Sequence, residues 1–147
     1  MADEAVVIRE VTELTAEMTA AILSLVRQLS SSATPDEAML RAVIDTAGST
    51  LLVAEIGDAV VGMCTLATMR VPTGVRSWIE DVVVDESARG GGIGSRLVEA
   101  ALAMASSHGA RNVDLTSRPE RAAANRLYRR LGFQERETNV YRYSLEN

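Results

Sequence analysis

The chain has 147 residues and contains no lysine, one cysteine, one histidine and few aromatic side chains. A lone cysteine, Cys64, excludes an internal disulfide, and a zinc site built from Cys64 and His108 would need carboxylates to complete it. A single histidine also leaves no second candidate for a histidine-based triad. We therefore expect no metal, Cys64 as a buried packing residue in an apolar strand, and His108 as an exposed cap before the helix-ending Gly109.

Long hydrophobic segments are absent as well. The longest apolar run, residues 59–69, is interrupted by Gly62, Thr65 and Thr68 and is too short to span a bilayer. The first four residues are acidic and lack the basic-then-apolar layout of a secretory signal. No repeat, low-complexity tract or convincing linker divides the chain. These features predict a cytoplasmic protein of one domain, residues 1–147, that does not act at a membrane.

Negative charge prevails, but the two signs are unevenly distributed. The 15 basic residues are all arginine and stand against 20 acidic residues, for a net charge of −5. Residues 1–88 have a net charge of −9, and residues 89–147 have one of +4. A general nucleic-acid-binding surface is therefore not expected. This division of charge fits two binding partners of opposite sign, a polyanion at the C-terminal half and a cation at the N-terminal half. The alternative is that the arginines simply coat the two late helices.

Hydrophobic spacing predicts alternating strands and helices in the order β-α-α-β-β-β-α-β-α-β, with one or two strands at the end. The predicted strands are residues 6–8, 50–56, 59–69, 77–85 and 113–116 and part of 135–145. The predicted helices are residues 15–29, a segment between the start signal at 34–37 and Gly48, then 95–107 and 121–131. Gly57-Asp58 joins two strands as a hairpin. The order describes a mixed α/β sheet with a parallel part near its end.

A glycine-rich turn, Gly90 to Gly92 followed by Gly94, lies where a predicted strand passes to a predicted helix. Glycine lets a ligand approach the backbone, and the first N–H groups of a helix have no internal partner and favour anions. The junction therefore predicts a phosphate cradle, flanked by Arg89 and Arg96 as mobile positive charge. A plain interaction domain would need only one glycine for a flexible turn.

The spacing of these glycines excludes two common phosphate-binding motifs. A dinucleotide fingerprint requires a third glycine where this chain has Ser95 or Leu97, depending on the starting glycine. A P-loop requires lysine, which the chain lacks. The pattern that fits is Arg-x-x-Gly-x-Gly, at Arg89, Gly92 and Gly94.

That pattern resembles the coenzyme A pyrophosphate loop of the GNAT superfamily of N-acetyltransferases. Residues 78–97 are similar to the family's fourth strand, turn and third helix, and residues 125–133 are similar to its later helix signature with Leu-Tyr and Gly-Phe. Together the two motifs cover residues 77–133. The resemblance implies an α/β (α+β) fold, in which a mixed, mostly antiparallel sheet with a splayed parallel pair is flanked by helices.

The resemblance also implies acetyl-CoA as the cofactor. The cofactor-binding residues that it implies are Val82, Val83, Val84, Arg89, Gly90, Gly91, Gly92, Ile93, Gly94, Ser95 and Asn125. The valines would act through backbone groups that the splayed strand leaves free for the pantetheine arm, and the Val82 N–H would point to the thioester oxygen. Asn125 is a weaker match, because the family's asparagine lies seven residues before its tyrosine, where this chain has Arg121.

Acyl transfer to an amine needs a proton acceptor for the amine and benefits from a proton donor for the thiolate. The resemblance places Tyr128 at the family's thiol-protonating tyrosine; the alternative is a packing anchor. Glu80 is the predicted base, since an acid in an apolar strand is costly unless it is solvated or used, and similar polyamine acetyltransferases carry a glutamate here. The alternatives are a solvated strand-end acid, Asp81 as the reserve, or a base on the next strand at Asp114 or Thr116.

The side chains around Glu80 should alternate between two faces of their strand. Extended geometry puts Glu80, Val82 and Val84 on one face and Asp81, Val83 and Asp85 on the other. A bulge, which the resemblance makes common in this strand, would disturb that assignment.

The predicted function is transfer of acetyl from acetyl-CoA to the amine of a small molecule by direct attack. The acidic N-terminal half fits a cationic acceptor. The alternatives are a glucosamine-phosphate-like acceptor, with Arg118 and Arg121 facing the phosphate, a protein or peptide amine, and a non-catalytic acyl-CoA-binding module. The sequence identifies neither the acyl chain length nor an interface for a homodimer, which such folds commonly form.

Overall fold

The computed structural model describes residues 5–146, which form two compact units, one ending at Thr116 and one beginning at Ser117. The elements of the first unit are β1 (Val6–Glu10), α1 (Ala16–Leu29), α2 (Glu37–Asp45), β2 (Ser49–Ile56), β3 (Ala59–Val71), β4 (Gly74–Val84), the 3-10 turn η1 (Glu86–Ala88), α3 (Ile93–Ser107) and β5 (Val113–Asp114). The second unit contains α4 (Ala122–Arg130). The predicted order is confirmed as far as α4, with small shifts at the element ends.

The five strands form one sheet in the order β1-β2-β3-β4-β5. The first three pairs are antiparallel, and β4 and β5 are parallel. The hairpin turn at Gly57-Asp58 is confirmed, since Ile56 and Ala59 are the last paired residues of β2 and β3. The predicted fold class is therefore confirmed: the sheet is mixed and mostly antiparallel, with its parallel pair at the last strand.

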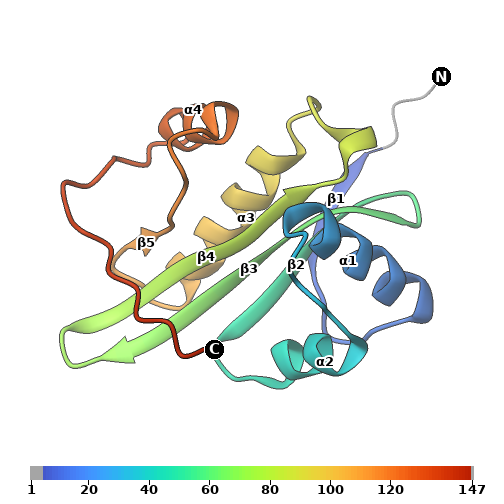
Figure 1. Cartoon of the computed structure of the whole chain (residues 1–147), viewed down its shortest axis with the longest axis horizontal. Helices are drawn as coiled ribbons and strands as arrows, with labels where there is room; N and C mark the ends of the chain where they lie inside the picture. The colour runs from blue at the N-terminus through green and yellow to red at the C-terminus, as the bar shows by residue number, and fades with distance from the viewer. Residues whose placement is uncertain (1–4, 147) are drawn as a thin grey trace. The chain divides into compact units, whose positions relative to one another are not determined.

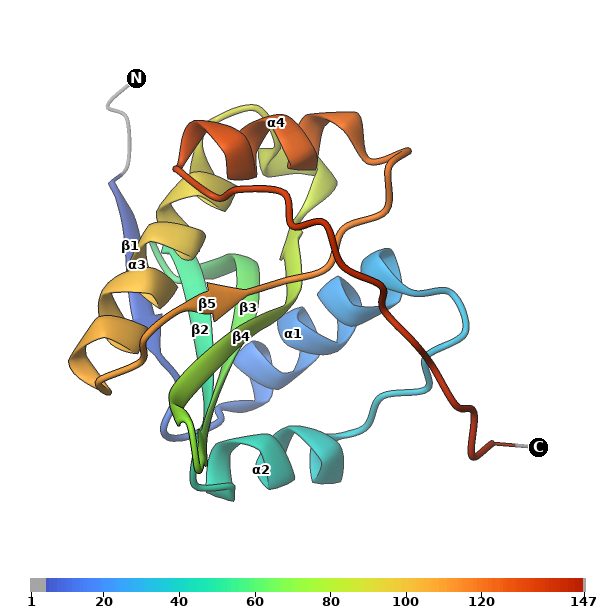
Figure 2. The same cartoon turned by 90° about the vertical axis from the view of Figure 1, so that its left-hand side faces the viewer.

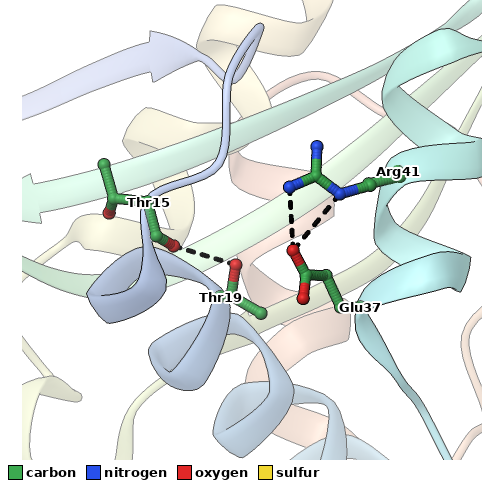
Figure 3. Close-up of polar contacts among 4 residues, drawn as sticks. All are labelled: Thr15, Thr19, Glu37 and Arg41. Carbon is green, nitrogen blue, oxygen red and sulfur yellow. Dashed lines mark hydrogen bonds and ion pairs between the residues drawn. The ribbon is translucent and has the colours of Figure 1, made fainter.

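The two N-terminal helices begin at polar caps, and Figure 3 shows two further polar contacts near their first turns, between Thr15 and Thr19 and between Glu37 and Arg41. The Thr15 side chain accepts a hydrogen bond from the Met18 N–H, and the Thr19 hydroxyl donates to the Thr15 carbonyl at 2.9 Å. The Asp36 side chain caps α2 in the same way. In α2, Arg41 and Glu37 form an exposed ion pair one turn apart, with Nη2 2.8 Å from Oε1. Side-chain caps satisfy the N–H groups that the first turn of a helix leaves unpaired.

Helices cover both faces of the sheet (Figures 1 and 2): α1 and α2 lie on one face and α3 on the other. The core on the α1 face consists of Val11, Met18, Ile22, Leu25, Leu40, Leu51, Val53, Met63 and Val83. On the other face α3 buries Ile93, Leu97, Val98, Ala101 and Ala105. Burial of this apolar area from both sides is the main stabilising contribution to the first unit.

The end of α3 follows the glycine signal of the sequence. Gly109 has a φ of +81°, and its N–H donates to the Ser106 carbonyl at 3.0 Å, while the Ala110 N–H reaches the Ala105 carbonyl at 3.0 Å. This pair of bonds is the Schellman arrangement that a left-handed glycine permits. His108 is the exposed C-cap residue, so both predictions for this site are confirmed.

The tail differs from the prediction. Residues 133–146 contain no strand, so the one or two strands expected in residues 135–145 are wrong. A strand needs a neighbour for its N–H and C=O groups, and among residues 117–146 the second unit offers none. The alternating apolar side chains Tyr141, Tyr143 and Leu145 are accordingly exposed.

Cys64 is fully buried in β3, and its thiol donates to the Leu97 carbonyl of α3 with Sγ 3.9 Å from the oxygen. The prediction of a packing residue is confirmed. Burial raises the pKa of the Cys64 thiol to about 12.

We expect a thiol reagent at pH 8 to leave the native protein unlabelled, because only about one Cys64 thiol in ten thousand is then ionised. In denaturant the pKa returns to about 8.5 and labelling should be complete within minutes. Mass spectrometry of timed samples measures both rates. Native labelling as fast as in denaturant would contradict the burial of Cys64.

Candidate active site

A β-bulge interrupts β4 beside the predicted catalytic glutamate. Glu80 pairs with Thr65 and Val83 pairs with Met63, so two residues of β4 stand opposite the single residue Cys64 of β3. The first of the two, Asp81, has a φ of +54°, and it is the one non-glycine residue with positive φ among residues 5–146. An extra residue in one strand shifts the alternation of every side chain and backbone group after it.

The bulge changes the faces expected for residues 80–85. Thr65 and Met63 lie two apart on β3 and share a face, so their partners Glu80 and Val83 share a face as well. Val83 is buried in the core on the α1 face, whereas Glu80 is exposed. The assignment of Glu80 with Val82 and Val84, and of Asp81 with Val83 and Asp85, is therefore wrong, because it assumed unbroken alternation.

The same shift turns the backbone of the last residues of β4. The Asp85 N–H donates to the Val61 carbonyl of β3 at 2.8 Å, so Asp85 faces β3. Because neighbouring residues of a strand point in opposite directions, Val83 also faces β3, and Val82 and Val84 direct their backbone groups away from it. Of the three valines predicted to act through the backbone, two therefore face the outer edge of β4.

That outer edge is open along the end of β4 in the first unit. The parallel pairing with β5 covers only Ser77 and Trp78, so the two strands diverge before Val82. The Val84 carbonyl accepts a hydrogen bond from Arg89 Nε at 3.0 Å. By this alternation the N–H and C=O of Val82 and the N–H of Val84 point toward the outer edge, the direction from which an extended ligand would pair with them as an added strand.

The glycine turn forms a backbone cradle at the start of α3. Gly90 and Gly92 have φ values of +87° and +79°, and Gly92 is the N-cap residue without a side-chain cap. A Cβ built at Gly90 or Gly92 would meet no heavy atom within 4 Å. The space before the turn is open, and the N–H groups of Ile93 and Gly94 begin the helix, at the end that favours an anion. This geometry fits a diphosphate.

The two arginines beside the cradle are held rather than mobile. Arg89 Nε donates to the Val84 carbonyl, and Arg96 Nη1 donates to the Val6 carbonyl of β1 at 2.6 Å. The prediction that both supply mobile charge is therefore wrong in this respect. Arg89 folds back onto the end of β4, whereas Arg96 holds its helix to β1.

Sequence reasoning missed Gln28, the exposed residue at the end of α1 that holds the segment before the cradle. Gln28 Nε2 donates to Asp85 Oδ1 at 2.7 Å, and Gln28 Oε1 accepts the Glu86 N–H at 3.2 Å. The Ser87 hydroxyl, the Gln28 amide and the Ser87 N–H hold the pKa of Asp85 below its usual value. Asp85 followed by Ser87 is a cap pattern that could have been read, but nothing in the sequence points to Gln28.

The second unit carries the predicted tyrosine and asparagine on α4. Tyr128 is buried and its ring meets Phe133 edge-on, with the centroids 5.7 Å apart. The Phe133 N–H donates to the Tyr128 carbonyl at 3.0 Å, and Gly132, with a φ of +102°, closes the helix. Asn125 Nδ2 donates to the Arg118 carbonyl at 3.0 Å. The Tyr128 ring is thus a packing anchor of α4.

Residues 5–146 contain no group of three or more histidine, cysteine or acidic side chains arranged to hold a metal ion. None of the helices in the same range is long and apolar enough to cross a membrane.

Comparison with known proteins identifies the family. A family model described as the acetyltransferase (GNAT) family matches residues 17–133. The chain therefore belongs to the GNAT family of acetyltransferases, the class of enzyme to which the fold and the cradle point. No curated protein sequence matches it significantly.

Solved structures share the fold over nearly the whole chain. An acetyltransferase from Trypanosoma brucei has 26% identity and a TM-score of 0.77, with 96% of this chain and 100% of that one covered. A transcriptional regulator from Bacillus halodurans C-125 has 27% identity and a TM-score of 0.79, with 95% of this chain and 100% of that one covered. An aminoglycoside N-acetyltransferase in complex with CoA has 19% identity and a TM-score of 0.80, with 97% of this chain and 96% of that one covered. At this identity the likeness shows only that the two proteins share a fold.

Proposed function

We propose that this chain transfers the acetyl group of acetyl-CoA to the amine of a small molecule by direct attack, with Glu80 as general base and Tyr128 as general acid. The observation that carries the proposal is the open edge of β4 running into the glycine cradle, because one extended thioester ligand with a diphosphate would fit both. The proposal treats residues 1–147 as a single catalytic domain working in the cytoplasm.

The cofactor would be held mainly by backbone groups. The diphosphate would lie against the amides from Gly90 to Ser95, with Arg89 beside them, and the pantetheine arm would pair with Val82 and Val84. Val83 would contribute only its buried side chain, since its backbone faces β3. Asn125 remains a candidate contact, although its amide already donates to Arg118.

When bound, acetyl-CoA supplies a thioester carbonyl that accepts the amine and a sulfur that leaves as a thiolate. Glu80 would take a proton from the bound amine, which is mostly an ammonium ion at neutral pH because an alkylamine has a pKa of about 10, and the free amine would then attack the carbonyl carbon. The nitrogen would lose its second proton as the amide forms, which balances the proton that Tyr128 gives to the sulfur. The Val82 N–H would donate to the carbonyl oxygen as negative charge develops there. Tyr128 would give its phenolic proton to the departing sulfur.

The acceptor is proposed to be a cationic small molecule. Glu80 and Asp81 are exposed at the open end of β4, in the half of the chain whose net charge is −9. The aminoglycoside acetyltransferase of similar fold acts on molecules of this kind. Incubation with acetyl-CoA and a panel of amines, with the appearance of free thiol as the readout, tests the proposal. Cofactor binding without thiol release from any amine would instead support a non-catalytic acyl-CoA-binding module.

Gly92→Ala and Gly109→Ala form a matched pair at the two ends of α3. Both residues have φ near +80°, and an added Cβ meets nothing within 4 Å at either. We expect each to cost roughly 1 kcal/mol of stability from backbone strain. Only Gly92→Ala should weaken acetyl-CoA binding in calorimetry, by roughly 10- to 100-fold, since it disturbs charge-assisted hydrogen bonds. Equal affinities in the two variants would contradict the cradle.

Glu80→Gln removes the proposed base without changing its shape. We expect kcat/KM at neutral pH to fall roughly 100-fold, and the deficit to shrink as pH rises because more of the amine is already deprotonated. Asp81→Asn is the control, since asparagine tolerates the left-handed φ of +54° at the bulge. A larger loss in Asp81→Asn than in Glu80→Gln would transfer the role to Asp81.

Tyr128→Phe removes the hydroxyl and keeps the ring that packs on Phe133. We expect kcat to fall roughly 10- to 1000-fold, with the Kd for acetyl-CoA and the melting temperature nearly unchanged. Phe133→Leu is the packing control. It should lower the melting temperature and leave kcat nearly unchanged. An unchanged rate in Tyr128→Phe would leave Tyr128 as a packing anchor only.

A further inference from the structure

Gln28 joins the end of α1 to the turn that precedes the glycine cradle, across 57 residues of sequence. Its side-chain amide both donates and accepts a hydrogen bond. Nε2 donates to Asp85 Oδ1 at 2.7 Å, and Oε1 accepts the N–H of Glu86 at 3.2 Å. Donating and accepting at two adjacent residues fixes the direction of the chain there, which a single bond does not.

Asp85 passes this restraint into η1. Its second carboxylate oxygen, Oδ2, accepts the Ser87 N–H at 3.1 Å and also the Ser87 hydroxyl. The Ala88 N–H donates to the Asp85 carbonyl at 2.9 Å, and Arg89 Nε returns to Val84. The segment from Val84 to Arg89 is therefore tied at each end to β4 and, through Gln28, to α1.

Arg89 of the same segment is the charged group that acts on Asp85, and α1 contributes the uncharged Gln28. Hydrogen bonds from Ser87 and Gln28, with the charge of Arg89, hold the pKa of Asp85 below its usual value, so Asp85 is ionised at neutral pH. An ionised Asp85 can only accept hydrogen bonds. The group opposite it must therefore donate, as the Gln28 amide does.

We propose that Gln28 is a positioning residue for the cofactor: through Asp85 and Glu86 it sets the placement of the loop that grips the diphosphate. This inference rests on the proposed function. Gln28 has no place in the chemistry and is exposed, so its effect should fall on cofactor affinity. The α1 helix, which follows β1, thereby acts on a loop that follows β4.

Gln28→Leu removes both hydrogen bonds at similar side-chain size. We expect calorimetry to show acetyl-CoA binding weakened roughly 3- to 10-fold, as for the loss of one to two hydrogen bonds, with KM for acetyl-CoA raised to match and kcat little changed. Ser24→Ala, at an exposed residue one turn earlier on α1, is the control and should bind as the natural protein does.

Gln28→Glu separates positioning from simple stabilisation of the fold. At pH 7 the new carboxylate faces ionised Asp85 and cannot donate to it, so binding should be at least as weak as in Gln28→Leu. Near pH 5 the close pair of carboxylates shares a proton, the donor is restored, and the Kd relative to the natural protein at the same pH should improve. Gln28→Leu has no such group, so its relative Kd should not change with pH.

The possible outcomes distinguish failure of the Gln28 inference from failure of the proposed function. If the natural protein gives no heat with acetyl-CoA, the proposed function fails. If the natural protein binds and Gln28→Leu binds equally well, the inference alone fails. The inference also fails if Gln28→Glu shows no recovery near pH 5, or if kcat falls with KM unchanged, because then Gln28 would not act through the placement of the loop.

Discussion

The β-bulge at Asp81 and Val82 is the constraint on which the candidate active site depends. Without it, Val82 and Val84 would turn their backbone groups into the sheet, toward β3, and β4 would end as an ordinary paired strand. With the extra residue, the backbone groups of both valines face the open edge, while Val83 still buries its side chain against α1. The inserted residue thus decides which backbone groups reach the open edge, those of Val82 and Val84, and which side chain enters the core, that of Val83.

The cradle depends on the bulge because β4 leads directly into it. The restraints on this segment come from three separate places: Gln28 of α1, the sheet through Asp85 and Val61, and Arg89 returning to Val84. If this loop binds a diphosphate as proposed, holding it in place beforehand favours binding, since less conformational entropy is then lost. The glycines open the space, and the surrounding hydrogen bonds keep its shape.

Much of the fold could be predicted because its signals are local. The helix start at Asp36, the hairpin at Gly57 and the helix end at Gly109 all depend on neighbouring residues, and each was found where the sequence indicated. The tail shows the opposite case. Alternating Tyr141, Tyr143 and Leu145 favour a strand, but a strand forms only beside another, and residue spacing carries no information about the neighbour.

For the candidate site, the sequence by itself supplied the groups on which the proposed chemistry depends: the glycine pattern after a strand, the acids at Glu80 and Asp81, and Tyr128 before Gly132-Phe133. Tertiary structure alone decided which way these groups face. The bulge reversed the expected faces of residues 80–85, Arg96 was drawn to β1, and Gln28 became a partner of Asp85. The reason is physical: composition and spacing act through the local chain, whereas register and long-range hydrogen bonds exist only once distant segments have packed together.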